Sequence, residues 1–203
     1  MKIPTFQEFL LQEAPVAYSG DFKGNKVKLN LISKTGIDRY YNEIKLVRSH
    51  RLQTSKDIRV FLIEKRTKAV IGFFNDDSFV PCAELFLTVY NSIDSLGYHN
   101  VLQTSEVQTD YNYRNEGFAS SLYLSLIEAG NTLISDYSQF DGARNLWRSI
   151  GKTSGIKLDV YDDIDRVVSK EHIIVHTSIE NLDKEWSCAP DNSCDNILFI
   201  AYK

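Results

Sequence analysis

The chain has 203 residues, of which 43% are hydrophobic, 12% aromatic and 25% charged, a composition typical of a folded globular protein and not of a disordered one. Its formal net charge of −4 provides no overall attraction to a polyanion, so general nucleic-acid binding is not expected. No apolar run approaches the roughly 20 residues of a membrane-spanning helix. We expect a cytoplasmic protein without a membrane anchor, as a monomer or a homodimer.

The N-terminal part of the sequence predicts two helices and one strand. Residues 4–13 place a proline before apolar residues interleaved with Gln and Glu, which predicts a small amphipathic helix. The alternation over Val27–Ile32 predicts a first strand. Apolar and aromatic residues three and four positions apart over Ile37–Leu52 predict a second helix.

The middle of the sequence is rich in predicted strands. Ile58–Glu64 and Ala69–Phe74 flank a short polar turn, and this pattern predicts a β-hairpin. Cys82–Tyr90 and Val101–Thr109 are two further β-rich segments, separated by a polar stretch that contains a glycine.

The composition then changes to alternating helices and strands. Gly117–Ala129 carries the strongest helical pattern, and a glycine follows where the helix should stop. Thr132–Asp136 and Ile156–Tyr161 predict strands, with a helix over Asp141–Ile150 between them. A strand, a helix and a second strand in this order, beginning at Val101, predict a parallel strand pair joined by a crossover helix.

The C-terminal part predicts two more strands, Glu171–Thr177 and Asn196–Tyr202, in a β extension over residues 171–203. No repeat, low-complexity tract or Pro/Gly/Ser-rich linker divides the sequence. We therefore expect a single domain over residues 1–203, with an α/β fold and a mixed sheet.

The three cysteines do not form a disulfide framework. A bridge between Cys188 and Cys194 requires an oxidising compartment, to which nothing else in the sequence points. These two cysteines with His172 and His176 lack the paired spacing of structural zinc ligands, so no metal site is expected. We interpret the segment as a polar hairpin tip that carries two thiols.

One junction in the sequence points to chemistry. Residues 106–120 connect the last β-rich segment to the strongest helix, whose first turn carries the small residues Gly117, Ala119 and Ser120. First-turn N–H groups lack partners within the helix and the helix dipole is positive there, so such a turn suits a pyrophosphate. Gly117 would let the backbone approach the anion, and Arg114 would add a charge-assisted contact. Alternatively, the glycine is a turn residue and the arginine is solvated.

The same segment resembles the GNAT family of N-acetyltransferases. Arg114–Ala119 matches that family's R/Q-x-x-G-x-G/A signature, between a strand and an amphipathic helix. Downstream, Leu133–Asp136 resembles the family's fifth strand and Ala143–Lys152 its next helix, so the resemblance covers residues 101–161, about a third of the chain. A looser similarity to acetyltransferase-like proteins of bacteriophages rests on five residues: Ser135, Asp136, Gln139, Leu146 and Trp147.

This resemblance implies an acyl-CoA N-acyltransferase-like fold, with a mostly antiparallel central sheet, a splayed parallel strand pair and flanking helices. It also implies acetyl-CoA as the co-substrate. In that family the pyrophosphate lies on the backbone amides of the signature loop, which correspond here to Asn115, Glu116, Gly117, Phe118 and Ala119, with Ser120 behind them. The pantetheine arm pairs like an extra strand with the strand before the loop, here Val107, Gln108 and Thr109.

Acetyl transfer to an amine needs a base, donors for the developing oxyanion and a proton for the departing thiolate. Glu106 and Asp110 are candidate bases because residues four apart share one face of a regular strand. The alternative for each is a strand-face charge paired with a neighbour. The family's usual acid is a tyrosine on the helix after the fifth strand, but residues 141–152 contain none. Tyr137 and Ser138 are the available substitutes.

Two functions follow from these observations. The first is an acetyl-CoA-dependent N-acetyltransferase acting on an amine of a small molecule or a protein. The second is a catalytically silent acetyltransferase-like binding module, for instance a phage protein that engages a host factor. The intact Arg114–Ala119 loop favours the enzyme, and the missing helix tyrosine favours the binding module.

Overall fold

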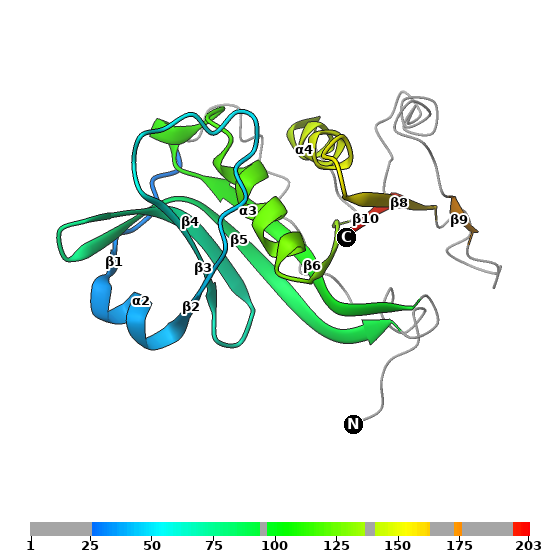
Figure 1. Cartoon of the computed structure of the whole chain (residues 1–203), viewed down its shortest axis with the longest axis horizontal. Coiled ribbons are helices and arrows are strands. Elements are labelled where there is room, and N and C mark those ends of the chain that lie inside the picture. Colours follow the sequence, from blue (N-terminus) through cyan, green and yellow to red (C-terminus); the bar gives the residue numbers. More distant parts are fainter. Residues whose placement is uncertain (1–25, 94–96, 137–140, 163–172, 176–196) are drawn as a thin grey trace.

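The computed structural model describes residues 26–93, 97–136, 141–162, 173–175 and 197–203 (Figure 1). The helix expected over residues 4–13, Tyr137 and the segment with Cys188 and Cys194 lie outside these residues. None of the helices in the described ranges is long and apolar enough to cross a membrane.

The described chain forms an α/β fold built on one mixed, strongly curled sheet of ten strands (Figure 1). In chain order the elements are β1 (Ile32–Ser33), α2 (Lys34–Tyr40), β2 (Tyr41–Ile44), β3 (Ile58–Ile63), β4 (Lys68–Asn75), β5 (Ser78–Ile93), β6 (Tyr98–Thr109), the 3₁₀ helix η2 (Tyr111–Tyr113), α3 (Phe118–Glu128), β7 (Thr132–Ile134), α4 (Asp141–Gly151), β8 (Lys157–Asp162), β9 (Ile173–Val175) and β10 (Ile197–Tyr202). The strand order is β2-β3-β4-β5-β6-β7-β10-β8-β9, and β1 pairs with β5.

Among the described strands, β6 and β7 form the one parallel pair, and all other neighbours are antiparallel. Val101, Leu102 and Gln103 of β6 pair with β7, and the pairing stops there although β6 continues to Thr109. The predicted parallel pair around a crossover helix is therefore confirmed, and it is short.

A bulge in β6 lies directly after the residues that pair with β7. Thr104 lies opposite Leu87 of β5 and Glu106 lies opposite Phe86, so Ser105 is the extra residue on β6. A bulge bends the strand that carries it and increases its local twist. The position of this bulge provides a physical cause for β6 to turn away from β7.

Helices cover both faces of the sheet. Val60 and Ile71 contribute to the main core, which α3 joins through Leu122 and Leu126. The intervening residues Phe61 and Val70 point to the opposite face, where they pack with Ile37 of α2 in a smaller core that also contains Phe79. This alternation follows from the two-residue period of a strand.

Most predicted elements are confirmed with small shifts at their ends. The hairpin over residues 58–74 forms as β3 and β4, and the strongest predicted helix is α3. The helix expected from Asp141 is α4, and the segment expected at 156–161 is β8. The two β-rich segments between residues 82 and 109 form a longer hairpin than expected, because β5 begins at Ser78 and ends at Ile93.

The strand expected at Val27–Ile32 is wrong, since only Ile32 and Ser33 form a two-residue strand. The preceding residues instead bind the chain around η2. The Leu29 N–H donates to the Asp110 carboxylate at 3.0 Å, and the Val27 carbonyl accepts from the Tyr111 N–H at 2.9 Å. These partners are distant in sequence, so the local alternation did not indicate them.

The helix expected at Ile37–Leu52 is also wrong. The chain leaves α2 at Tyr40, forms β2 at the sheet edge and then continues without regular secondary structure through residues 45–57. Backbone pairing of β2 with β3 competes successfully with the helical periodicity, which is a weak local preference.

We expect Leu126→Ala to lower the free energy of unfolding by about 2–5 kcal/mol, because it leaves a cavity beneath α3 where the side chain is fully buried. Leu31→Ala is the matched control, since Leu31 is 64% exposed, and it should change stability by less than about 0.5 kcal/mol. Urea denaturation of both variants measures the difference. Equal midpoints would contradict the assigned core.

Candidate functional site

A pocket of about 540 Å³ lies where β6 leaves β7. Its wall on one side is the β6 segment Thr104–Thr109, and on the other it is α4, through residues that include Leu146 and Trp147. The first turn of α3, from Gly117 to Ser120, closes one end.

Most of the residues expected to bind the co-substrate line this pocket. They are Val107, Gln108, Thr109, Arg114, Asn115, Gly117, Phe118, Ala119 and Ser120, and the candidate base Glu106 lines it too. Glu116 and Asp110 are not among the lining residues. Tyr137 lies outside the described residues.

The β6 edge inside the pocket has no neighbouring strand in the described part of the chain. Its ladder with β7 ends at Gln103, while Thr104–Thr109 faces the pocket. The other edge of this segment remains paired with β5. A strand edge presents N–H and C=O groups to whatever lies beside it, so an extended ligand with amide groups can hydrogen-bond there.

The first turn of α3 presents backbone N–H groups at the end of the pocket. Gly117 is the N-cap, with φ 85° and ψ 8°, and it makes no side-chain capping hydrogen bond. The first intrahelical bond runs from the Ser121 N–H to the Gly117 carbonyl at 3.0 Å. The N–H groups of Phe118, Ala119 and Ser120 therefore have no partner within the helix, and the helix dipole favours an anion beside them.

An irregular segment, residues 45–52, runs along α3. Hydrogen bonds to serines of the helix hold it there. The Val47 N–H donates to Ser125 Oγ at 2.8 Å and the Ser49 N–H donates to Ser121 Oγ at 2.9 Å. The Ser49 hydroxyl in turn donates to the Gly117 carbonyl at 3.2 Å. We call residues 45–52 the strap, and these contacts fix it against the helix start.

The strap explains why residue 117 is glycine. A Cβ at this position would lie 2.6 Å from Ser49 Oγ, 2.8 Å from the Arg51 Cβ and 2.9 Å from the Leu52 nitrogen. The space was expected to admit a ligand, but the protein's own strap fills it. Substitution of Gly117 would disturb the strap and strain the backbone in any case, so it would not isolate ligand binding.

The strap also brings Arg51 to the pocket, where Arg114 lies as well. Sequence reasoning missed Arg51 because it placed this residue in a helix. The available signal was the basic cluster that begins at Arg48. Two guanidinium groups near the start of α3 provide bidentate donors for phosphate oxygens.

Glu106 is exposed on the pocket side of β6 and accepts a 2.7 Å hydrogen bond from the Gln108 side-chain amide. The two residues share a face because they lie two apart in a strand. The hydrogen bond from Gln108 restrains the orientation of the Glu106 carboxylate.

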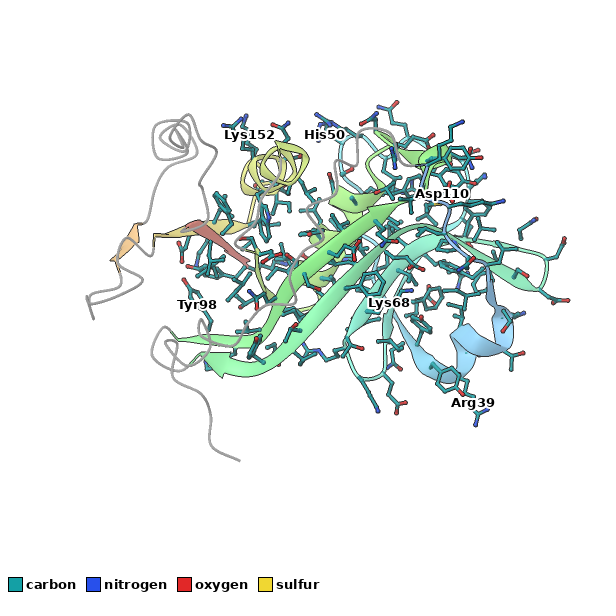
Figure 2. The ribbon with its side chains drawn as sticks, turned by 180° about the vertical axis from the view of Figure 1, so that it is seen from behind. Arg39, His50, Lys68, Tyr98, Asp110 and Lys152 are labelled. Atoms are coloured by element: carbon teal, nitrogen blue, oxygen red, sulfur yellow. The ribbon has the colours of Figure 1, made fainter. Side chains whose placement is uncertain are left out.

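Asp110 has a structural position instead. It follows the end of β6 (Figure 2) and is 5% exposed. Its carboxylate accepts from the Leu29 N–H at 3.0 Å and from the Asn112 backbone N–H, also at 3.0 Å, which caps η2. The expected shared face with Glu106 does not form, because Asp110 lies beyond the strand. We therefore assign Asp110 no catalytic role.

Tyr123 is a pocket residue that sequence reasoning did not single out as functional. It lines the pocket although its residue surface is only 3% exposed. Its ring meets Trp147 edge to face, with the centroids 5.4 Å apart, and its hydroxyl hydrogen-bonds Thr104. Trp147 itself is 2% exposed and belongs to the main core.

Other chemistry has little support in the described residues. They contain no cluster of three or more His, Cys, Asp or Glu side chains suited to a metal ion. Burial raises the pKa of the Cys82 thiol to about 12, so the thiolate needed for a nucleophile is disfavoured. A second hollow lies beside Phe73, but Lys56 already occupies the face of that ring, with Nζ 3.6 Å from the centroid.

No protein-family model, curated protein or solved structure that we compared with the chain matches it. The function is therefore inferred from the residues that line the pocket and from their arrangement.

We expect Asp110→Ala to lower the free energy of unfolding by about 1–3 kcal/mol, because the Leu29 and Asn112 N–H groups lose their acceptor. Asp38→Ala is the control, since Asp38 is an exposed residue of α2. Thermal denaturation compares the two variants. If both variants have the melting temperature of the wild-type protein, the Asp110 carboxylate does not hold this segment.

Proposed function

We propose that the protein is an acetyl-CoA-dependent N-acetyltransferase of the GNAT type, with an acyl-CoA N-acyltransferase-like fold, that acetylates an amine of a small molecule or a protein. The observation that carries this proposal is the combination, in one pocket, of a strand edge that no described strand pairs with and a helix start whose first N–H groups lack partners within the helix. The strand edge extends over Thr104–Thr109, and the helix start is the first turn of α3.

Acetyl-CoA matches this combination of features. Its pantetheine arm is extended and contains two amide groups, which suit the N–H and C=O groups of the β6 edge at Val107–Thr109. Its pyrophosphate is a dianion that suits the first-turn amides of α3. The arm and the pyrophosphate adjoin in the ligand, and Thr109 and the start of α3 are close in the chain and line the same pocket.

The basic side chains at this end also fit a nucleotide. Arg51 and Arg114 line the pocket from two different segments, the strap and the loop after η2. Charge-assisted hydrogen bonds to phosphate are stronger than neutral ones. A local positive region of this kind operates within a protein whose formal net charge is −4.

We assign Glu106 the role of the base in this proposal. Glu106 lines the pocket within the β6 segment whose edge would hold the pantetheine arm. A carboxylate there would take the proton from the attacking amine, directly or through water, while the amine nitrogen bonds to the acetyl carbon. The rest of the catalysis would come from holding the two reactants in position.

Calorimetric titration with acetyl-CoA tests the proposal. We expect saturable binding by the wild-type protein, weakened about 10-fold to 100-fold by Arg114→Ala through loss of a charge-assisted phosphate contact. Increasing salt should weaken the wild-type binding, because the phosphate contacts are electrostatic.

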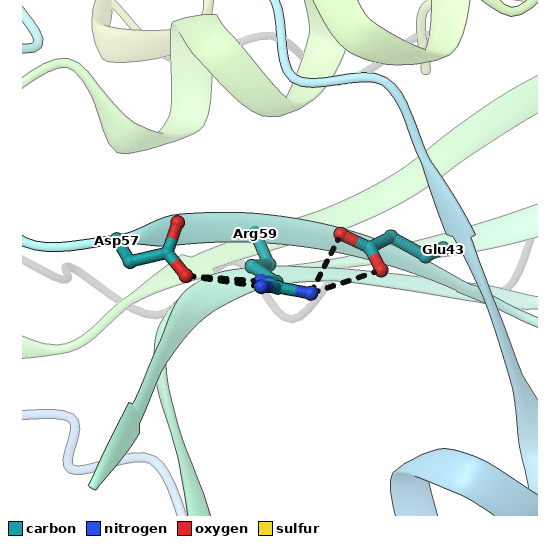
Figure 3. A network of polar contacts seen from close by, with 3 residues as sticks. All are labelled: Glu43, Asp57 and Arg59. Carbon is teal, nitrogen blue, oxygen red and sulfur yellow. Dashed lines mark hydrogen bonds and ion pairs between the residues drawn. The ribbon is translucent and has the colours of Figure 1, made fainter.

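Arg59→Ala provides the matched control. Arg59 lies on β3 and pairs with Glu43 at 3.3 Å and Asp57 at 3.1 Å, and it does not line the pocket (Figure 3). Its removal should leave the affinity for acetyl-CoA unchanged. Absence of heat with wild-type protein at near-millimolar ligand would reject the proposal, and equal weakening by both substitutions would reject the assigned phosphate end.

A further inference from the structure

We infer that the Tyr123 hydroxyl hydrogen-bonds the carbonyl oxygen of the bound acetyl group and holds the negative charge that develops on it during transfer. This inference rests on the proposed function, and it adds a catalytic residue to the same pocket. The residue comes from α3, near the middle of that helix.

The position of Tyr123 in the pocket suits this role. Tyr123 hydrogen-bonds Thr104, which directly follows Gln103, the last β6 residue that pairs with β7. The hydroxyl therefore lies where the two strands separate, at the opposite end of the β6 edge from Thr109. If the phosphates bind at the start of α3, the reactive thioester lies at the other end of the arm, beside this hydroxyl.

Packing fixes the orientation of the Tyr123 side chain. The Tyr123 ring meets Trp147 at an interplanar angle of 87°, and Trp147 stacks on Phe199 with the ring centroids 6.0 Å apart. Tyr123, Trp147 and Phe199 are all buried. A donor whose side chain is held by packing needs little reorganisation when charge develops, which is the condition for effective oxyanion stabilisation.

The protonation state of the Tyr123 hydroxyl also suits this role. Burial raises the pKa of Tyr123, hydrogen bonding with Thr104 lowers it, and the nearby charge of Asp136 raises it, with a net upward shift. The phenol therefore keeps its proton at neutral pH. A protonated phenol that lines the pocket can donate a hydrogen bond to a ligand there.

The other tyrosine among the described lining residues does not compete for this role. Tyr113 lies in η2 beside Arg114, at the end of the pocket assigned to the phosphates. Its ring packs on Phe73 at 6.1 Å and on Phe118 at 5.6 Å. It is therefore a suitable control residue.

In the proposed acetyl transfer, the amine nitrogen bonds to the acetyl carbon. The carbonyl π electrons move to the oxygen, where the Tyr123 O–H stabilises the negative charge. When the carbonyl re-forms, the carbon–sulfur bond breaks and its electron pair leaves on the CoA sulfur. The thiolate takes a proton from solvent, and Glu106 receives the proton that the amine loses.

Isotope-edited infrared spectroscopy of [1-¹³C]acetyl-CoA bound to the full-length protein tests this inference without requiring an acceptor. We expect the thioester carbonyl band to lie at lower wavenumber in the wild-type complex than in free acetyl-CoA. Tyr123→Phe should return the band to the free position, and Tyr113→Phe should not. Calorimetry with Tyr123→Phe should still show acetyl-CoA binding, so that the carbonyl band of the complex can be measured.

The outcomes separate the two proposals. Absence of acetyl-CoA binding by the wild-type protein would reject the proposed function and this inference with it. Binding with the same carbonyl band in wild type and Tyr123→Phe would reject the inference and leave the proposed function standing.

Thermal denaturation of Tyr123→Phe controls for a folding defect, and a Thr104→Val variant provides a second measurement. It removes the Thr104 hydroxyl next to the phenol, so a band unchanged from wild type in both variants would also overturn the inference.

Discussion

The short parallel pairing between β6 and β7 is the constraint on which the site depends. Three residues of β6 pair with β7, and the bulge at Ser105 then turns β6 away. Backbone N–H and C=O groups that lose one neighbour need another partner, in solvent or in a ligand. The separation of two strands that begin side by side therefore creates both the pocket and the polar edge that lines it.

The start of α3 depends on a second set of contacts, from the strap. The hydroxyls of Ser121 and Ser125 accept backbone N–H groups of the strap, and Ser49 donates to the Gly117 carbonyl. These bonds use serines on the helix side that faces the strap, and the residues of the first turn line the pocket. The same hydrogen bonds thus give backbone N–H groups of the strap their partners and position Arg51 beside the helix start.

The sequence predicted the elements whose formation depends on residues near one another in the chain. The β3–β4 hairpin, α3 and the parallel pair were predictable, because each follows from periodicity and chain order within about 40 residues. Residues 27–31 and the strap were not, because their partners lie at Asp110 and along α3, more than 65 positions away. Long-range hydrogen bonds of this kind leave no periodic pattern in the sequence.

The residues of the candidate site also fall into those that the sequence predicted and those that it did not. The loop from Arg114 to Ser120 carries a motif, and the sequence indicated most of its pocket residues. Tyr123 was hidden within a helical stripe, and Arg51 in a segment with the wrong predicted structure. Asp110 was mistaken for a candidate base, because strand spacing was extended past the last residue of β6.

The most direct test of the acyl-CoA site is to map CoA binding by ¹⁵N NMR of the backbone amides. We expect the largest chemical-shift changes at Thr109, Ala119 and Ser120, with Gly36 in the region of α2 unaffected. Shifts centred on the hollow beside Phe73, or no shifts at near-millimolar CoA, would contradict the assignment of this pocket.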